Sequence, residues 1–496
     1  MAELKARVLA GWAGLQVIFA LFLLVAPNSF ASPFSQTRSI ISSGMIDYPR
    51  IEVTVNASVT IGLNNLSLGF MLDHDWEGWL QDSVLRECAS NASFKIVRLF
   101  DWKWSDLRPC ISWNESTTSG AFNWSNIDLL VKRIFGIGAE PLFCLGAFSE
   151  SYTGERSFCA PPGMAINPET ALPYLDSWAT YCAEWVKHFK STGCPVRFYE
   201  IVNEPYFYFG WTDSVKLDNY VKLWNAAARK MREVNSNVML SHDAIMFGQV
   251  MDYWTKYGDD VDFLSFHKYD CYATEGPGYF DNAAMLDRAE SHYFNFVDQA
   301  RLKWFNSRGK LLPVINSESG FSSTWKNGTD PRITQMIGAV WTALELRMGV
   351  LKGLSGNIYY AFSSSASICR NSATGGYGFG MVNSDDDKPW YPYYVHWMLG
   401  NNMQVGDPII YSNSSSNDLR SLAWIHNETM NILLIYKIEQ ESKITLQGLE
   451  GSVNFIKIDE TISWRTPYLQ IGIIDSKAAL SMSGYTVVLL QTPIHT

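Results

Sequence analysis

Two glutamates occupy matching positions in the sequence, each directly after a short apolar run. Glu204 follows the run 196–203, and Glu318 follows the run 311–317. A carboxylate that comes straight after a buried strand is costly to place unless it faces a functional site. Cleavage of a glycosidic bond requires two carboxyl groups, one protonated to assist the leaving oxygen and one ionised to attack the anomeric carbon or to activate water. We therefore take Glu204 and Glu318 as a candidate catalytic pair.

The neighbours of the first glutamate have separate expected roles. The amide of Asn203 can donate a hydrogen bond to a sugar hydroxyl, a contact that strengthens in the transition state. Pro205 restricts the residue before it to an extended backbone, which would fix the direction of the carboxyl group. Glu200 lies on the same face of the strand but deeper within it, so we expect it to pair with Arg98 or Arg197.

Aromatic residues make up 14% of the chain, which contains 19 tryptophans. A cluster at 206–211 follows Glu204 directly. Flat rings pack well against sugar rings, so the cluster is typical of a stacking platform, although a loop packed on the rim of its own domain would have the same composition. We select Trp102 and Trp211 as substrate-binding residues and expect most other tryptophans in the core.

Two His-Asp pairs, His74 with Asp75 and His242 with Asp243, carry side chains that can bind metals. They come from different predicted strands and lack the spacing of a metal site, so structural packing is the favoured interpretation. The chain has no Gly-x-Ser-x-Gly motif and no phosphate-binding Gly-rich loop. We expect neither a metal nor an organic cofactor.

Short apolar runs alternate with longer helical patterns between residues 66 and 399. In the helical stretches apolar residues recur with a period of 3.6, as in 172–189. Eight such repeats predict an α/β fold, a (β/α)8 TIM barrel over residues 62–400, whose active site is built at the C-terminal ends of the strands. Both glutamates then lie at that end. The eight predicted strands are Leu66–Leu72, Phe94–Phe100, Ala139–Leu145, Val196–Asn203, Val238–Asp243, Asp262–His267, Leu311–Ser317 and Gly356–Phe362.

The sequence pattern changes after Gly406, where alternating apolar and polar residues replace the helical period. This predicts a β-sandwich domain over residues 406–496. A strand at 50–61, ahead of the barrel, is expected to join it, so that the two ends of the chain meet in one sheet.

The formal net charge of the chain is −10, and no run of basic residues is present. Nucleic acid is excluded as a partner because its binding requires clustered Lys and Arg. A neutral oligosaccharide or polysaccharide is a better partner for this composition.

The first 31 residues have the composition of an export segment. A weakly basic start precedes the uncharged apolar run 8–26, and small residues at 29 and 31 permit cleavage after Ala31. Such a run is either removed as a signal peptide or retained as a membrane tether, so we expect the protein outside the cell or at its surface. Eight Asn-x-Ser/Thr sequons agree with an exported glycoprotein; their asparagines are Asn56, Asn65, Asn91, Asn114, Asn123, Asn327, Asn413 and Asn427.

The eight cysteines are an even number and could form disulfides in an oxidising compartment. Cys88 with Cys110 and Cys182 with Cys194 are candidate pairs. Cys144 lies in an apolar run and is expected to be a buried thiol.

The motifs around the two glutamates resemble those of clan A glycoside hydrolases, a large retaining (β/α)8 superfamily. Asn203-Glu204-Pro205 closes the fourth strand, as in that clan. The stretch from Ser265 to Tyr269 is similar to the clan's His-x-Tyr, which implies that Tyr269 holds the nucleophile and that His267 hydrogen-bonds the substrate or the glutamate pair without transferring a proton.

Arg98, in Val97-Arg98-Leu99, resembles the arginine that keeps the nucleophile of this clan ionised. A cation at that distance would lower the pKa of Glu318, while the flanking apolar strand could raise that of Glu204.

Within the clan the chain most resembles glycoside hydrolase family 39, with families 5 and 79 as neighbours. The similarity lies in 122–128 and 138–143 before and in the third strand, in Gly378–Met381, in Lys388-Pro389 and in the trailing β-sandwich. Phe100 and Ser319 depart from the family pattern, which tends to have His and Trp there. These positions are expected at the substrate end, so the family's xylosidase and iduronidase specificities are not transferred.

We therefore expect a retaining glycoside hydrolase that cleaves β-linked glycans by double displacement, with Glu318 as nucleophile and Glu204 as general acid/base. An endo-acting cellulase or glucanase, or a transglycosylase, would use the same residues. A non-catalytic cell-surface carbohydrate-binding protein on a degenerate barrel is the alternative outside the enzymes.

Overall fold

The computed structural model describes residues 48–73, 75–101, 107–150, 156–194, 196–210, 212–243, 248–272, 275–325, 328–449, 451–461, 470–475 and 477–494. The predicted export segment and the residues His74, Trp102 and Trp211 lie outside these ranges. Within them, none of the helices has the length and apolar character needed to span a membrane.

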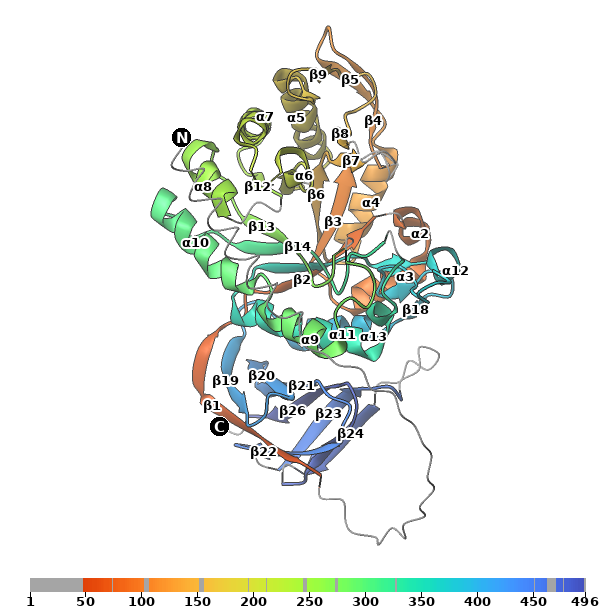
Figure 1. The fold of residues 1–496 in the computed structure, drawn as a ribbon, viewed down its shortest axis with the longest axis vertical. Helices are drawn as coiled ribbons and strands as arrows, with labels where there is room; N and C mark the ends of the chain where they lie inside the picture. The colour runs from red at the N-terminus through yellow and green to blue at the C-terminus, as the bar shows by residue number, and fades with distance from the viewer. Residues whose placement is uncertain are drawn as a thin grey trace, which may run out of the picture. The chain divides into compact units, whose positions relative to one another are not determined.

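Eight parallel strands form a nearly closed barrel, in the order β12-β11-β6-β3-β2-β15-β14-β13. The barrel occupies the upper part of the molecule in Figure 1. Side-chain hydrogen bonds link β12 to β13. Ser241 Oγ donates to Phe263 O at 2.7 Å, and Ser265 Oγ donates to His242 O at 2.8 Å. The predicted (β/α)8 barrel is confirmed. Its strands are β2 (Ser67–Leu72), β3 (Ile96–Asp101), β6 (Glu140–Leu145), β11 (Phe198–Ile201), β12 (Met239–His242), β13 (Leu264–Tyr269), β14 (Val314–Gly320) and β15 (Gly356–Tyr359).

Helices connect successive barrel strands and surround the sheet (Figure 1). Several begin at an aspartate whose carboxylate accepts backbone N–H groups of the first turn, as Asp82, Asp213 and Asp281 do. The main helices are α2 (Trp76–Gln81), α3 (Ser83–Asn91), α4 (Ser125–Gly136), α5 (Leu175–Ser191), α6 (Tyr206–Phe209), α7 (Ser214–Val234), α8 (Gly248–Tyr257), α9 (Asn282–Ser291), α10 (Phe294–Arg308), α11 (Met336–Leu351) and α13 (Tyr391–Asn402).

Two apolar layers result from strand alternation in the barrel. Outward-facing strand residues and the helices form one large core, which includes the fully buried Trp178, Trp185, Trp224, Trp254 and Trp341. A small cluster fills the barrel interior, and its members are Met71, Phe100, Leu142, Cys144, Phe263, Ile315 and Ile358. Cys144 is a buried thiol, as predicted.

The C-terminal part is a nine-stranded sheet, in the order β24-β23-β26-β21-β20-β19-β1-β22-β25. Strand β1 (Arg50–Leu63) comes before the barrel in sequence, yet it lies between β19 (Pro408–Ser414) and β22 (Ser442–Gln447). The other strands are β20 (Leu419–His426), β21 (Thr429–Tyr436), β23 (Ser452–Ile458), β24 (Gln470–Asp475), β25 (Leu480–Met482) and β26 (Thr486–Pro493).

Alternation along β21 explains how this sheet is buried on two sides. Ile432 and Leu434 belong to the sheet's own apolar core, whereas Leu433 and Ile435 belong to the core of the barrel. The sheet therefore packs directly against the barrel.

All eight cysteines are unpaired, so the suggested pairs Cys88–Cys110 and Cys182–Cys194 are wrong. Cys88 lies on α3 whereas Cys110 lies in the hairpin strand Cys110–Asn114, and Cys182 is buried on α5 whereas Cys194 is only partly buried beyond the end of that helix. Sequence spacing carries no information about such placements.

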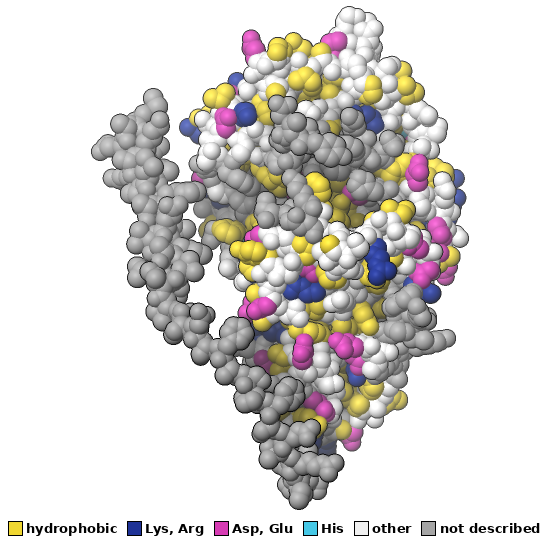
Figure 2. Space-filling view, turned by 45° about the vertical axis from the view of Figure 1, so that its right-hand side comes forward, with side chains coloured by type: hydrophobic (Ala, Val, Ile, Leu, Met, Phe, Trp, Pro, Cys, Tyr) yellow, Lys and Arg dark blue, Asp and Glu magenta, His cyan; other side chains and the backbone are white. Residues whose placement is uncertain are grey.

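Charged side chains of both signs are scattered over the described surface shown in Figure 2, with no continuous basic patch on this face.

Candidate active site

A bulge in β14 turns Glu318 into the barrel mouth. Phe266 pairs with Asn316, but the next residue of β13, His267, pairs with Glu318. Ser317 therefore adds one residue to β14. Strict alternation would point Glu318 outward; the extra residue turns it inward, beside His267.

The end of β11 carries Glu204 on a strained backbone. Its φ is +44°, in the left-handed region that non-glycine residues seldom adopt. The extended geometry predicted from Pro205 is therefore wrong. The Glu204 N–H donates to Asp243 Oδ2 at 2.6 Å, and this contact holds the backbone in a conformation that local preference disfavours.

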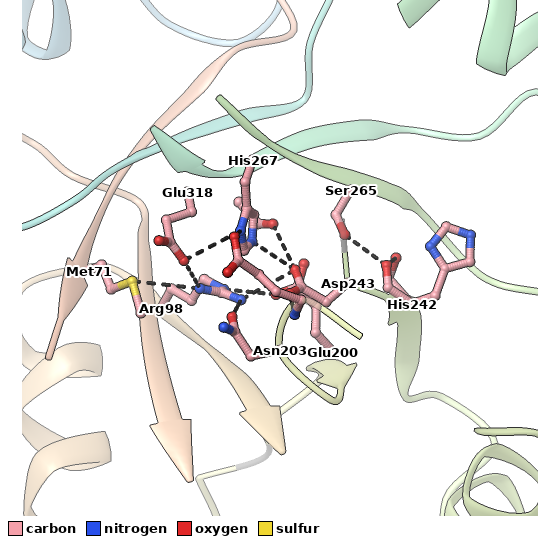
Figure 3. Close-up of polar contacts among 12 residues, drawn as sticks. Met71, Arg98, Glu200, Asn203, His242, Asp243, Ser265, His267 and Glu318 are labelled. Carbon is pink, nitrogen blue, oxygen red and sulfur yellow. Dashed lines mark hydrogen bonds and ion pairs between the residues drawn. The ribbon is translucent and has the colours of Figure 1, made fainter. Parts of the chain in front are cut away.

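Arg98 lies at the centre of the polar cluster and is fully buried (Figure 3). Its Nη1 donates to Glu318 Oε2 at 3.0 Å, and its Nη2 donates to Asn203 Oδ1 at 3.0 Å. Its Nε donates to Glu200 Oε2 at 2.7 Å, which confirms the pairing expected for Glu200. Arg197 instead pairs with Glu140, at 2.6 Å on the surface.

The two oxygens of Glu318 have separate donors. The hydroxyl of Tyr269 donates to Oε1 at 2.5 Å, and Arg98 donates to Oε2. Burial raises the pKa of Glu318, against the lowering effect of His267 and Arg98. Arg98 lowers the pKa of Glu318 as predicted, but the desolvation of the buried carboxylate outweighs the attraction of the guanidinium, so the net shift is upward.

His267 is held between carboxylates on both sides. Its Nδ1 lies 2.8 Å from Glu204 Oε1 and 3.5 Å from Glu318 Oε2, and its Nε2 lies 2.8 Å from Asp243 Oδ1. Burial alone would lower the pKa of His267, but Asp243 and Glu318 raise it well above its usual value. The two flanking carboxylates therefore favour the protonated form of the His267 ring.

The catalytic candidates lie close together. One oxygen of Glu204, one oxygen of Glu318 and Nδ1 of His267 all lie within 4.8 Å of one another. Such a trio could hold a metal ion, and the same side chains are also hydrogen-bonded or ion-paired with one another and with Arg98 and Tyr269.

The family model described as Glycosyl hydrolases family 39 matches residues 59–342. The chain belongs to this family. It is therefore a glycosidase that hydrolyses O-glycosyl compounds, its substrate is a carbohydrate, and the resemblance to clan A is confirmed.

Relatives of this family 39 chain agree with the assignment. A β-xylosidase of Caldicellulosiruptor saccharolyticus is 22% identical over 418 residues, which cover 78% of this chain and 79% of the relative. The solved family 39 β-xylosidase from Caulobacter crescentus has a TM-score of 0.61 at 14% identity and covers 90% of this chain and 100% of its own. A bifunctional glucanase-xylanase from a metagenome library has a TM-score of 0.58 at 12% identity, with the same coverage. These structures share the fold.

In this family 39 chain the structure brings six predicted site residues into one cluster. These are Arg98, Asn203, Glu204, His267, Tyr269 and Glu318. Tyr206 interacts with Glu204 as well. Burial and the Glu204 carboxylate together raise the pKa of the Tyr206 phenol. Trp102 and Trp211 stay predictions because they lie outside the described residues.

Asp243 is the cluster member that sequence reasoning missed. The sequence pairs Asp243 only with His242, as candidate metal ligands, yet His242 packs in the helix layer, its ring centroid 4.7 Å from that of Trp254. The signal that could have found Asp243 is its place directly after β12, at the C-terminal end of a barrel strand.

The two departures from the family pattern lie in the wall of the site. The Ser319 hydroxyl points outward and donates to both oxygens of Glu345 on α11, at 2.7 Å. Phe100 lies inside the barrel, with its ring centroid 4.8 Å from the guanidinium carbon of Arg98. The expectation that Ser319 lines the substrate end is therefore wrong, because the bulge at Ser317 reverses its direction.

Proposed function

We propose that this glycosidase cleaves β-linked glycans with retention of configuration, with Glu318 as nucleophile and Glu204 as general acid/base. The observation that carries the proposal is the separation of the two carboxylates, whose facing oxygens lie within 4.8 Å. Retaining enzymes hold their carboxyl groups roughly 5–5.5 Å apart, whereas inverting enzymes need roughly 6.5–9.5 Å to admit a water molecule. This spacing favours direct attack on the anomeric carbon.

In the first step Glu318 attacks the anomeric carbon while the Glu204 carboxyl group gives its proton to the leaving oxygen. Tyr269 and Arg98 hold the two Glu318 oxygens in place for that attack. In the second step Glu204 takes a proton from water, and the resulting hydroxide displaces Glu318 from the sugar.

The amide orientation of Asn203 supports its role in substrate binding. Arg98 has only donors, so the amide atom that faces it must be the oxygen. The nitrogen of Asn203 is then turned elsewhere as a donor, and a sugar hydroxyl at the anomeric end is the acceptor we propose for it.

For the substrate we propose β-xylosides and β-glucosides as the first sugars to test. A relative is named a β-xylosidase, and a solved structure of the same fold is named a glucanase-xylanase.

We also propose that the protein is exported as a glycoprotein, either secreted or tethered through residues 8–26. Asn327 lies outside the described residues; the asparagines of the other seven sequons are all exposed. Exposure is required of a glycosylated asparagine, so this distribution supports the proposal.

The test is a hydrolysis screen of aryl β-glycosides and soluble polysaccharides with the wild-type protein and its Glu204→Ala, Glu318→Ala and Glu140→Ala variants. Glu140 lies at the opposite end of a barrel strand in a surface ion pair, and it is the matched control. We expect Glu318→Ala to lose at least about 10³-fold in kcat/KM on every substrate, Glu204→Ala to lose as much on substrates with poor leaving groups, and the control to keep wild-type activity. Binding of glycans without turnover by the wild-type protein, or full activity of Glu318→Ala, would contradict the proposal.

A further inference from the structure

Asp243 contacts the backbone of Glu204 and the His267 ring that contacts the Glu204 carboxyl group, but it is too deeply buried to contact substrate. It is fully buried directly after β12. Its Oδ2 accepts the Glu204 N–H at 2.6 Å, and its Oδ1 lies 2.8 Å from His267 Nε2 and 3.3 Å from Arg98 Nη2. Three strands that are distant in the sequence therefore meet at one carboxylate (Figure 3).

The hydrogen bond from the Glu204 N–H to Asp243 fixes the backbone of Glu204. A glutamate at φ +44° needs its surroundings to hold it there. The N–H at 2.6 Å from a carboxylate is a short, charge-assisted hydrogen bond, and such bonds are about twice as strong as neutral ones.

The contact of Asp243 with His267 fixes the position of the Glu204 carboxyl group. Nε2 of the ring lies 2.8 Å from Asp243 Oδ1, and Nδ1, the other ring nitrogen, lies 2.8 Å from Glu204 Oε1. One buried carboxylate thus sets both the backbone of the acid/base and the donor that contacts its side chain.

We propose that Asp243 is the positioning residue of the acid/base, fixing the Glu204 backbone directly and the direction of its carboxyl group through His267. This inference rests on the proposed function.

Other charged and titratable groups face Asp243 and His267 from the elements packed around them. They are Arg98 on β3, Cys144 on β6, Glu200 on β11, Tyr206 on α6, Tyr220 on α7 and Glu318 on β14. A pH profile alone would mix their titrations with that of Glu204. The dependence of rate on the leaving group isolates the acid.

The experiment measures kcat/KM of wild type and Asp243→Asn on aryl glycosides of one sugar, from dinitrophenyl to alkyl-like leaving groups. A displaced acid matters little when the leaving group departs unaided. We therefore expect a loss of about 100-fold or more on the poorest leaving groups and of less than about 5-fold on the dinitrophenyl glycoside. An equal loss across the series, or no loss, would overturn the inference.

Asp270→Asn is the matched control for removal of a buried carboxylate. Asp270 is equally buried after the neighbouring strand, but its carboxylate pairs with Lys268 at 2.6 Å and His292 at 2.8 Å. We expect this variant to melt at a lower temperature with the leaving-group dependence unchanged. A leaving-group-selective loss in Asp270→Asn as well would assign the effect to general damage.

If Asp243→Asn does not fold, His267→Gln tests the same link on the pH plateau of each protein, because His267 also lowers the pKa of Glu318. The same selective loss is expected, and a uniform loss would overturn the inference. The proposed function fails separately, if wild type hydrolyses nothing or if Glu318→Ala remains active.

Discussion

Glu318 depends on Tyr269 and Arg98 in different ways, although each donates one hydrogen bond to it. Arg98 also binds Glu200, Asn203 and Asp243, so its removal would leave buried carboxylates unpaired and would damage the fold. The Tyr269 hydroxyl has Glu318 as its hydrogen-bond acceptor. It is therefore the cleaner probe of the nucleophile.

We predict that Tyr269→Phe shifts the acidic limb of the kcat/KM profile to higher pH. The hydroxyl stabilises the ionised carboxylate and lowers the pKa of Glu318, so its loss raises that pKa and the nucleophile is protonated over a wider range. A hydrogen bond to a charged group is worth about 1.5–3 kcal/mol, or roughly 1–2 pH units.

The measurement is the pH profile of wild type, Tyr269→Phe and the control Tyr253→Phe, whose hydroxyl bonds Asp218 on the helix layer. An unchanged or downward-shifted limb in Tyr269→Phe would show that this hydroxyl does not stabilise the ionised nucleophile.

At this scale the sequence predicts residues that end strands or alternate along them, such as Glu204, Glu318 and Tyr269. It does not predict Asp243, because the main-chain N–H that Asp243 accepts belongs to a residue 39 positions away. It also misjudges the pKa of Glu318, because burial outweighs a cation that the sequence does identify.

The bulge in β14 is held from behind by α11. Asn316 Nδ2 donates to Glu345 Oε1 at 2.9 Å, and Ser319 Oγ donates to the same carboxylate at 2.7 Å. These outward-facing residues lie on either side of Ser317 and Glu318. One buried side chain therefore anchors both ends of the segment that turns the nucleophile inward.

We predict that Glu345→Gln removes a pH-dependent loss of stability. Burial raises the pKa of Glu345 to about 7, from 4.5. Glu345 thus binds a proton more tightly in the folded than in the unfolded state. This proton stabilises the folded state fully below pH 4.5, and the stabilisation is lost as pH rises towards 7. The total is about 3 kcal/mol, from 1.36 kcal/mol per pKa unit.

Melting temperatures of wild type and Glu345→Gln between pH 4.5 and 8 would check this prediction. The melting temperature of the variant, relative to that of wild type, should rise as pH rises. Parallel curves would mean that Glu345 keeps the same proton affinity in the folded and unfolded states.

Element positions follow from the sequence because buried parallel strands are near-continuous apolar runs. All eight barrel strands overlap their predicted ranges. The bulge at Ser317 and the left-handed backbone of Glu204 do not follow, since each depends on which neighbour a strand pairs with.

The barrel and the C-terminal sheet are joined by an ion cluster around Glu290 of α9. Arg420 of β20 donates to it at 2.7 Å, Lys437 lies 3.2 Å away, and Arg347 of α11 lies 3.3 Å away. The side chain of Glu290 is only 14% exposed, so its charge interacts strongly with these cations.

We predict that Glu290→Gln destabilises the whole chain by on the order of 2 kcal/mol at neutral pH, because Arg347 and Arg420 then lose their carboxylate partner, while Lys437 keeps Asp287 at 3.5 Å. Burial would raise the pKa of Glu290, but Arg420 and Lys437 outweigh it and lower the pKa below 4.5. An ionised Glu290 therefore stabilises the folded state at pH values above its unfolded pKa, and this stabilisation is lost as the pH falls and the carboxylate is protonated.

The difference in melting temperature between wild type and Glu290→Gln should therefore be largest above pH 6 and should shrink below pH 4.5. A difference that stays constant across this range would contradict the role of the charge. Sequence patterns could not predict this junction, since alternation shows which faces of β21 are apolar but not what packs on them.

The most direct test of the central claim is the configuration of the sugar at the moment of release. Proton NMR of the first turnovers on an aryl β-glycoside distinguishes the two anomers before mutarotation mixes them. The carboxylate spacing predicts that the β-anomer appears first, through a covalent intermediate on Glu318. Initial release of the α-anomer would contradict double displacement by Glu204 and Glu318.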